Sequence, residues 1–307
     1  MAKTSATPAA QGGGHKRQTG GAGLRAGRGA RLRQHTVRLI ALLLLCAAAL
    51  QLYFVARIAL MAVLAPQSTS FQRSEAWRLL VEKHRIDWRQ DWVDQGRIGA
   101  NLKRAVIASE DAGFVDHSGV EWDALEQAWE KNQRAEAVAA RRNAQLDKRA
   151  APDPNKGSGK GGSKHSDQPT ALGKPGAAAK PRVDPKVVGG STISQQLAKN
   201  LFLSGERTAL RKAQEFMLTL TLEALLPKRR ILEIYLNSVE WGEGVFGAQA
   251  AAQHYFRTDA ARLDTLSAAR LAVMLPAPKR FEKSPGSAYV SGRAGTIAAR
   301  MGGVALP

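Results

Sequence analysis

The hydrophobic pattern of the chain begins with a long apolar run. Residues 37–64 contain two almost purely apolar stretches, LIALLLLCAAALQLYFVA and IALMAVL, which are separated by one arginine, Arg57. A helix that crosses a bilayer needs about 20 apolar residues, so this run predicts a transmembrane helix. Arg57 lies near one end of the run, where its long side chain can reach the lipid headgroups. We therefore expect a single membrane anchor here.

Charges on either side of this run predict its orientation. Five arginines lie before the run or at its start, namely Arg25, Arg28, Arg31, Arg33 and Arg38. Only two basic residues follow it closely, Arg73 and Arg78. Because cytoplasmic flanks are the richer in Lys and Arg, we expect a cytoplasmic N-terminus and a domain outside the cytoplasm after residue 65. A cleaved signal peptide is the alternative, but the long segment before the run, its apolar length and the lack of a clear small-x-small site favour a retained anchor.

Beyond the anchor, apolar residues recur at helical spacing. Leu102, Val106 and Ile107 share one helical face, and a second helix is indicated by Trp122, Leu125, Ala128 and Trp129. The same periodicity returns in four later segments, at residues 193–203, 209–226, 230–236 and 265–275. No convincing run of alternating strand residues separates them. The pattern therefore predicts a mainly α fold, with one N-terminal transmembrane helix.

One internal segment breaks the helical pattern. Residues 131–186 are rich in Ala, Lys, Gly and Pro and include DPNKGSGKGGSKHSDQP. Such a composition cannot bury enough apolar surface to offset the entropy of ordering, so we expect a flexible basic insertion. The chain then divides into a basic tail, the anchor, a globular domain that contains the insertion, and a C-terminal tail, at residues 1–36, 37–64, 65–278 and 279–307.

The distribution of charge argues against a nucleic-acid partner. The formal net charge is +19, which by itself would suit phosphate binding. Sixteen of these charges, however, lie in residues 1–38 and 131–186, and the remainder of the chain is nearly balanced at +3. We therefore expect no nucleic acid. The one cysteine, Cys46, lies in the apolar run, which excludes an intramolecular disulfide framework and a cysteine-based metal site.

A glycine-rich hexapeptide, GEGVFG at residues 242–247, fits the letter of a dinucleotide-binding fingerprint. That fingerprint requires a preceding strand within a βαβ unit, whereas this hexapeptide follows the predicted helix RRILEIYLN. We interpret it as a turn.

Candidate chemistry lies first in EDAGFVDHSG, at residues 110–119. Glu110 and Asp111 are adjacent, so on a helix end they point in different directions, and we expect one to react while the other orients. Asp111, Phe114 and His117 follow at three-residue steps, which could bring His117 back to a carboxylate. Taken alone, a structural histidine and a solvated glutamate would explain this segment.

Two further segments combine polar and cationic groups. In GGSTISQQLAKN, residues 189–200, Ser191 or Thr192 can cap a helix, on which Gln196 and Lys199 offer an amide and an ammonium to an oxygen-rich ligand. Downstream, Arg211 and Glu215 share a helical face beside Lys212, and a helical salt bridge is the default interpretation. Each segment has an ordinary explanation by itself, but the three together favour a shared cause.

That combination resembles glycosyltransferase family 51, the peptidoglycan glycosyltransferases. Four segments resemble its motifs in order: EDAGFVDHSG, GGSTISQQLAKN, RKAQEFMLTLTLE and KRRILEIYLNSVEWG. The resemblance covers residues 98–278 apart from the insertion, which separates the first two motifs more widely than is usual in the family. Because no SxxK and KTG pair follows, we expect the monofunctional biosynthetic transglycosylase branch.

The resemblance implies a lysozyme-like helical domain, partly embedded in the outer leaflet of the inner membrane, that polymerises lipid II into β-linked glycan strands and releases undecaprenyl diphosphate. By resemblance, both Glu110 and Glu215 are catalytic: Glu110 is the general base of an inverting displacement, and Glu215 is the second motif carboxylate, near the cation cluster. Asp111, Phe114 and His117 would shape the site of the base. The donor diphosphate would be held by Thr192, Gln196, Lys199, Arg211 and Lys212.

Partners, cofactor and location also come from the resemblance. Lipid II and the growing glycan strand are the expected substrates, with membrane lipids and a cell-wall synthesis complex as further partners. A divalent cation, Mg²⁺ or Mn²⁺, could assist departure of the diphosphate, and Glu215 could help to place it, although no metal-ligand spacing is visible. The expected location is the inner membrane, with the catalytic domain in the periplasm.

Two other functions stay open at this stage. A lysozyme-like glycan hydrolase or lytic transglycosylase must protonate a poor leaving group with a carboxyl of raised pKa, and it has little use for three clustered cations. A non-catalytic scaffold could instead bind acidic polymers or headgroups through its basic arms. Replacing Glu110 by Gln separates enzyme from scaffold, because only an enzyme needs that carboxylate.

Overall fold

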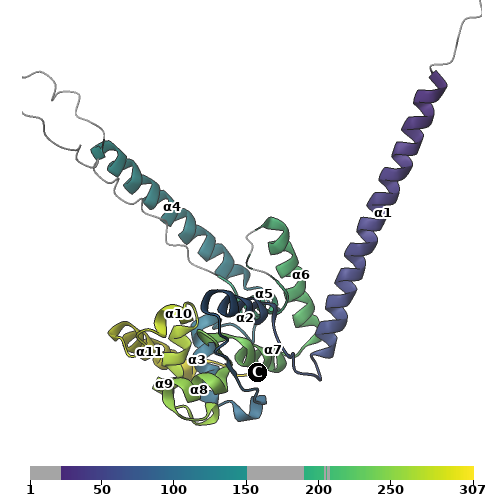
Figure 1. Cartoon of the computed structure of the whole chain (residues 1–307). Coiled ribbons are helices and arrows are strands. Elements are labelled where there is room, and N and C mark those ends of the chain that lie inside the picture. The colour runs from purple at the N-terminus through teal and green to yellow at the C-terminus, as the bar shows by residue number, and fades with distance from the viewer. Residues whose placement is uncertain (1–21, 151–189, 204, 206–207) are drawn as a thin grey trace, which may run out of the picture. The chain divides into compact units, whose positions relative to one another are not determined.

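A computed structural model describes residues 22–150, 190–203, 205 and 208–307 of the chain (Figure 1). The chain divides into two compact units, of which the first ends at Arg57 and the second spans Ile58–Pro307. Helix α1, Ala22–Leu60, contains the apolar run: within Arg33–Leu60, its most apolar 18 residues have a mean hydropathy of 2.5 and are not buried. Among the described residues this is the one helix long and apolar enough to cross a membrane, and it fits a single-pass anchor.

The second unit is mainly helical, as the sequence predicted. Its helices are α2 (Ser70–Lys83), α3 (Ala100–Glu110), α4 (Trp122–Ala150), α5 (Ile193–Phe202), α6 (Ala209–Leu225), α7 (Lys228–Ser238), α8 (Ala248–Phe256), α9 (Thr265–Met274), α10 (Pro278–Phe281) and α11 (Ala288–Arg300). Short 3-10 turns lie at Gln95–Arg97, Ala260–Arg262 and Met301–Gly303. The strands are β1 (Arg89–Gln90), β2 (Glu240–Gly242) and β3 (Val245–Phe246).

The three strands form one small sheet in the order β1-β3-β2. β1 is parallel to β3, and β2 is antiparallel to β3. With two or three residues each, these strands are too short to show alternation, which is why the sequence pattern did not predict them. Within GEGVFG, only Glu243 and Gly244 form the turn, whereas Gly242 ends β2 and Val245–Phe246 form β3, so the interpretation as a turn is confirmed for the centre of the hexapeptide alone. Gly244 has φ +72°, and a Cβ there would lie 2.0 Å from the Asp87 carbonyl oxygen, so only glycine fits.

Helix α3 is the central helix of the domain. Its apolar face, with Leu102, Val106 and Ile107 at most 1% exposed, packs against α9 and α11 (Figure 1). Alanines at 268, 269 and 272 on α9 let the two backbones approach closely. Burying this face fixes the direction of α3 and therefore the place where its last residue, Glu110, leaves the helix.

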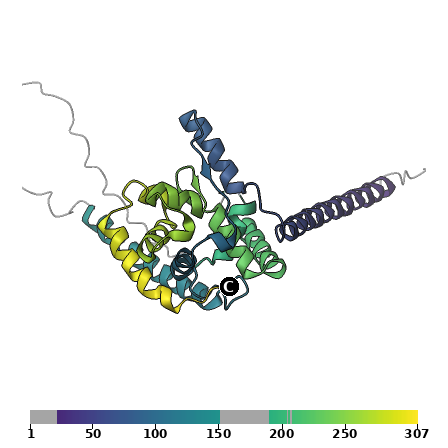
Figure 2. The ribbon, with the colours of Figure 1, turned by 90° about the horizontal axis from the view of Figure 1, so that it is seen from below.

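The C-terminal segment belongs to the domain. Our sequence boundary at residue 278 lies too early, because α11 buries Val290, Ala294 and Ile297 at helical spacing against α9 and α3. From below, the yellow α11 lies along one edge of the domain (Figure 2). Pro and Gly in residues 276–286 delay the helix but do not prevent it.

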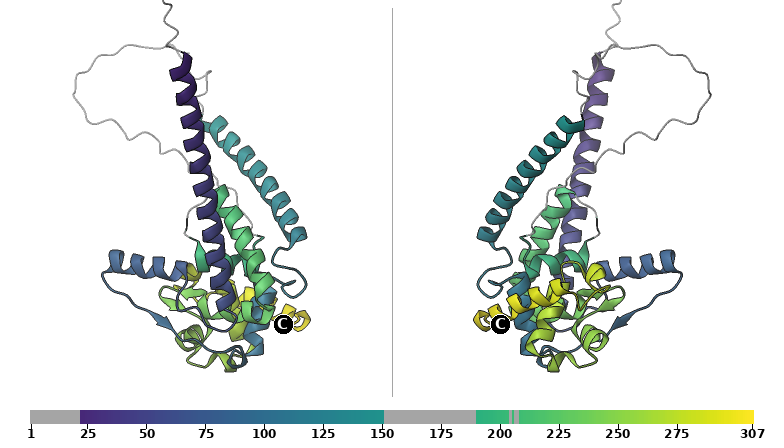
Figure 3. Two further views of the ribbon diagram at one scale, coloured as in Figure 1. Left: turned by 90° about the vertical axis from the view of Figure 1, so that its right-hand side faces the viewer. Right: turned by 90° about the vertical axis from the view of Figure 1, so that its left-hand side faces the viewer.

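The expected insertion also begins later than predicted. The sequence predicts a flexible segment from residue 131, but residues 131–150 continue α4, because Ala, Glu, Arg and Gln are good helix formers. Residues 151–189 lie outside the described residues, so flexibility there stays a prediction. Both panels of Figure 3 show α4 and α6 leaving the rest of the domain on the same side.

Candidate functional site

Glu110 is the last residue of α3, and its carboxylate faces α5. Gln196 donates from Nε2 to Glu110 Oε2 at 3.1 Å, and Ser109 Oγ donates to Glu110 Oε1 at 3.3 Å. Burial raises the pKa of Glu110, the hydrogen bonds from Gln196 and Ser109 lower it, and the charge of Asp111 raises it further. A carboxylate with partial burial and neutral donors is suited to take up a proton.

The start of α5 is fixed by a capping box. Thr192 Oγ1 accepts from the Gln195 backbone N–H, and Gln195 Oε1 accepts from the Thr192 N–H, both at 3.2 Å. Thr192 Oγ1 also donates to the Gly119 carbonyl at 2.6 Å. Thr192 is therefore occupied in joining α5 to the loop before α4, and it places Gln196 on the first turn of α5.

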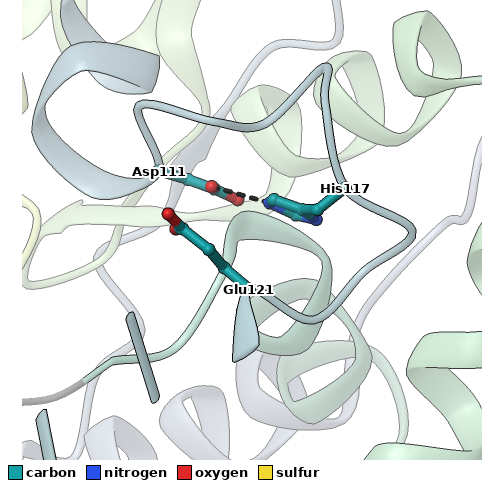
Figure 4. A group of neighbouring side chains, drawn as sticks. All are labelled: Asp111, His117 and Glu121. Carbon is teal, nitrogen blue, oxygen red and sulfur yellow. Dashed lines mark hydrogen bonds and ion pairs between the residues drawn. The ribbon is translucent and has the colours of Figure 1, made fainter. Parts of the chain in front are cut away.

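Asp111 and His117 complete this connection (Figure 4). Asp111 is 5% exposed; its Oδ2 accepts from the Ile193 N–H at 2.9 Å, and its Oδ1 pairs with His117 Nε2 at 2.8 Å. His117 Nδ1 accepts from the Gly119 N–H at 3.0 Å, so Nε2 holds the proton that is donated to Asp111. Gly119 has φ +90°, a conformation that glycine adopts readily. These contacts orient the loop, and both oxygens of Asp111 are used in them.

Phe114 belongs to this loop and points into the protein. It is fully buried, and Lys228 Nζ lies 4.5 Å from the centroid of its ring. The His117 ring meets it edge-on with 6.5 Å between the ring centroids, and these contacts give Phe114 a packing role. Direct contacts of Asp111, Phe114, His117 and Thr192 with a substrate stay predictions.

The cations gather where α5 meets α6. Arg211 Nη1 donates to Glu215 Oε2 at 3.2 Å, and Lys212 Nζ donates to Glu215 Oε1 at 2.5 Å. Glu215 is 4% exposed, so both of its oxygens are occupied by cations within the protein. Arg211 Nε is buried and has no hydrogen-bond partner among the residues that the structure describes, which leaves this guanidinium with unused donor capacity.

Lys199 of α5 faces the same cluster. Lys199 is exposed to solvent, but the surrounding protein partly desolvates its ammonium group and so lowers its pKa. The charge of Glu215 opposes this shift, whereas the charges of Arg211 and Lys212 lower the pKa further. Three cations thus share one buried counter-ion, and the excess positive charge suits an anionic ligand. Gln196, Lys199, Arg211 and Lys212, which the sequence placed in one binding site, are therefore brought to neighbouring positions.

Two pockets flank this cluster. One, of about 590 Å³, is lined by Gln196, Lys199 and Arg211, with Glu75 and Glu240 also in its lining. The other, of about 600 Å³, reaches Lys212 and Glu215 but is otherwise bordered mainly by apolar side chains, including Trp122, Phe216 and Met217. A polar pocket and an apolar pocket on either side of an anion site suit an amphiphilic phosphate-bearing ligand.

The amino-acid sequence around this site matches a known family. The sequence model of the Transglycosylase family covers residues 79–141 and 176–302. The chain belongs to the transglycosylase family. Its relatives include a biosynthetic peptidoglycan transglycosylase of Burkholderia thailandensis, 47% identical over 259 residues, which are 84% of this chain and 82% of the relative. A protein of the same name from Cupriavidus pinatubonensis is 48% identical over 266 residues, 84% of this chain and 86% of the relative.

Membership confirms the sequence prediction of a glycosyltransferase enzyme with a lysozyme-like helical domain. The two matched ranges leave a gap at residues 142–175, inside the expected insertion. The family match also reaches residue 302, in agreement with the packing of α11 as part of the transglycosylase domain.

Sequence reasoning missed one polar residue of this transglycosylase site. Tyr235 of α7 is 1% exposed, and its hydroxyl donates to Gln196 Oε1 at 2.9 Å. In the segment KRRILEIYLN it occupies an apolar position of the helix, so the pattern identified a core residue. No sequence signal distinguishes a buried tyrosine whose hydroxyl bonds to a residue of the site from one whose hydroxyl has a purely structural partner.

One cluster among the described residues could hold a metal ion by proximity. Asp111, His117 and Glu121 each offer a ligand atom within 4.8 Å of the others (Figure 4). The donor set does not fit Mg²⁺, which prefers oxygen ligands and keeps several waters, because His117 Nε2 is protonated and Asp111 already accepts two hydrogen bonds. Glu215 fits no better, since each of its oxygens accepts from a cation.

Proposed function

We propose that this transglycosylase joins lipid II units into β-linked glycan strands and releases undecaprenyl diphosphate, with Glu110 as the general base. The relatives support the substrate class, since they are named biosynthetic peptidoglycan transglycosylases. One observation supports the mechanism above the others: α5 supplies both the amide that contacts Glu110 and the ammonium of Lys199, which faces the cations of α6. Base and anion site are thus held by one short helix.

In the proposed step, the acceptor sugar hydroxyl attacks the anomeric carbon of the donor. Its proton passes to the Glu110 carboxylate, the new C–O bond forms, and the bond between the anomeric carbon and the phosphate oxygen breaks, so that its electron pair leaves with the diphosphate. Attack on the face opposite the leaving group converts an α-linked donor into a β-linked product. One carboxylate is sufficient, because the step needs one base.

The leaving group explains the cations. A departing diphosphate develops negative charge that needs stabilisation more than it needs a proton, and Lys199, Arg211 and Lys212 can supply it. A glycan hydrolase would need a free carboxylic acid as proton donor. Glu215 is not free for that role, because Arg211 and Lys212 occupy both of its oxygens. Glu110 by itself would suit either reaction, so the observation that favours transfer over hydrolysis is the cluster of three cations, for which a hydrolase has little use.

Location and partners are part of the same proposal. The charge bias around α1 supports a cytoplasmic N-terminus and a periplasmic catalytic domain at the inner membrane, where a lipid-linked donor would be present. Membrane lipids are then direct neighbours, and a cell-wall synthesis complex is a further partner. The orientation can be tested with the full-length protein in sealed vesicles of known sidedness. A membrane-impermeant label would show which of the segments before and after α1 faces the outside of the vesicle.

The decisive experiment is incubation of the detergent-solubilised full chain with labelled lipid II. We expect polymer on a gel and one undecaprenyl diphosphate for each bond formed, and we expect neither with Glu110→Gln. Release of free disaccharide without polymer would identify a hydrolase. Intact lipid II with the wild-type protein would contradict the proposal.

The participation of a divalent cation in the departure of the diphosphate is a separate proposal. The described carboxylates do not form a fitting metal site by themselves. Removing metals with EDTA and then adding Mg²⁺ or Mn²⁺ to the same assay tests it: a metal-dependent enzyme loses and regains polymerisation, whereas an unchanged rate contradicts the requirement.

A further inference from the structure

We propose that Tyr235 is a positioning residue that acts through the Gln196 side chain to keep the Glu110 carboxylate ionised and ready to accept a proton. This inference rests on the proposed role of Glu110 as general base. It adds a residue from α7 to a site otherwise built by α3, α5 and α6.

The contacts form a chain of three side chains. The Tyr235 hydroxyl donates to Gln196 Oε1 at 2.9 Å, and Gln196 Nε2 donates to Glu110 Oε2 at 3.1 Å. Nε2 also lies 3.4 Å from the Ser191 carbonyl oxygen. Each donor in this chain therefore meets an acceptor, and the carboxylate terminates the chain.

This arrangement determines which way the Gln196 amide points. If the amide were turned by half a rotation, its oxygen would face two acceptors, Glu110 Oε2 and the Ser191 carbonyl, and both hydrogen bonds would be lost. The amino group would then face the hydroxyl of Tyr235. Because Tyr235 is 1% exposed, its hydroxyl hydrogen would lose its protein acceptor in a place without solvent. Tyr235 thus stabilises the orientation in which the amide donates to Glu110.

The Tyr235 hydroxyl stays a donor over the working pH range. Burial raises its pKa well above the ordinary value, and the charges of Glu110 and Asp111 raise it further. A phenol that keeps its proton polarises the amide, and a polarised N–H is the stronger donor to a carboxylate. This chain counteracts the burial of Glu110, which by itself favours the protonated and inactive form.

Tyr235→Phe tests the inference, since it removes one hydroxyl and keeps the ring that packs in the core. We expect turnover at neutral pH to fall by up to about tenfold, the upper end of the range for loss of a hydrogen bond between neutral groups. The acid limb of the kcat/KM profile should also move to higher pH by about one pH unit, so the loss is greater at pH 6 than at pH 8.

Ser238→Ala is the matched control. Ser238 lies on the same helix, is 3% exposed, and its hydroxyl donates to the Ile234 carbonyl at 2.6 Å, away from Glu110. It measures the general effect of deleting a buried hydroxyl from α7. We expect no movement of the acid limb in this variant. Equal profiles for the two variants would overturn the inference.

A second measurement does not depend on turnover. The carboxylate band of Glu110 can be titrated by infrared difference spectroscopy of the full chain in detergent, with Glu110→Gln as the reference spectrum. Tyr235→Phe should raise the midpoint of this titration, and Ser238→Ala should not. An unchanged midpoint would refute the role of Tyr235 whatever the substrate is, whereas a raised midpoint without polymer from wild-type protein would refute only the proposed function.

Discussion

The two motif carboxylates of this transglycosylase, Glu110 and Glu215, have very different surroundings. Glu110 accepts hydrogen bonds from the neutral Gln196 and Ser109, whereas Glu215 accepts from the cations Arg211 and Lys212. Burial raises the pKa of Glu110, and a raised pKa brings a carboxylate closer to the range where it exchanges protons at neutral pH. The environment therefore separates a carboxylate that can take up a proton from one whose charge is used within the protein.

This comparison refines the sequence interpretation, which placed both glutamates in the catalytic set. On the structural evidence, Glu110 is the candidate for direct chemistry. Glu215 holds Arg211 and Lys212 in place for an anion and would act through them, which makes it a positioning residue in our proposal.

The largest expected effect is that of Glu110→Gln. The amide keeps the size of the side chain but cannot accept the proton, so polymerisation should fall by about 10³-fold. Steady-state turnover of labelled lipid II measures this loss. A thermal melt close to that of the wild type would show that folding is intact. Retention of a tenth of the wild-type rate would exclude Glu110 as the base.

Glu215→Gln should have a smaller effect of a different kind. Removing the counter-ion leaves Arg211 and Lys212 without their shared partner, so we expect kcat/KM to fall about 10- to 100-fold. The acid limb of the pH profile should stay where it is, because Glu110 is unchanged. If Glu215→Gln instead abolished that limb, Glu215 would be the proton acceptor and the comparison would be reversed.

Lys199 tests the anion site from the alkaline side. Partial desolvation lowers the pKa of Lys199, so its ammonium should lose its charge at a lower pH than that of an ordinary lysine. The rate should therefore fall as the pH rises through the pKa of Lys199. Lys199→Arg keeps the charge at high pH. We expect this variant to work within about tenfold of the wild type at neutral pH but without the alkaline limb. The measurement is kcat/KM of both proteins from pH 7 to 10. The same alkaline limb in the wild type and in Lys199→Arg would contradict this role of Lys199.

Much of this fold could be predicted from the sequence, for identifiable reasons. The helices that follow apolar periodicity, such as α3, α5 and α6, were found because one face of each packs against the domain. The C-terminal helix α11 was missed because Pro and Gly before it suggested a tail, and the extension of α4 was missed because its composition is polar as well as helix-favouring.

The site was predictable to the extent that its residues form ordered motifs. Gln196, Lys199 and Arg211 lie close in the structure as the motifs implied. Partners across elements were not predictable: the pairing of Asp111 with the start of α5 and the bond from Tyr235 to Gln196 both depend on helix packing. A single sequence without such packing shows which groups are present but not which of them meet.

A third carboxyl, Glu240, sharpens the comparison through stability. It is 6% exposed, lines the polar pocket, and has Lys279 Nζ 3.7 Å from its Oε1, although that lysine binds Glu75 more closely, at 2.6 Å. Glu240 is thus buried, as Glu110 is, and has a cation near it, as Glu215 does, but its cation lies farther away. Burial raises the pKa of Glu240 from 4.5 to about 7, with Lys279 opposing and Glu75 and Glu282 contributing.

Glu240→Gln should therefore stabilise the protein at high pH. A raised folded-state pKa means that the folded chain retains a proton that the unfolded chain has lost, so stability falls as pH rises from 4.5 to about 7. Gln has no charge to bury, and we expect a gain of about 2 kcal/mol at pH 8 and little change at pH 4, measured by thermal unfolding of the full chain. Glu243→Gln is the control of opposite sign: Arg78 and Lys83 bind Glu243 and lower its pKa to about 2, so its loss should destabilise the protein at pH 8. A lower melting temperature for Glu240→Gln at pH 8 would mean that the Lys279 interaction outweighs burial, and that Glu240 resembles Glu215 rather than Glu110.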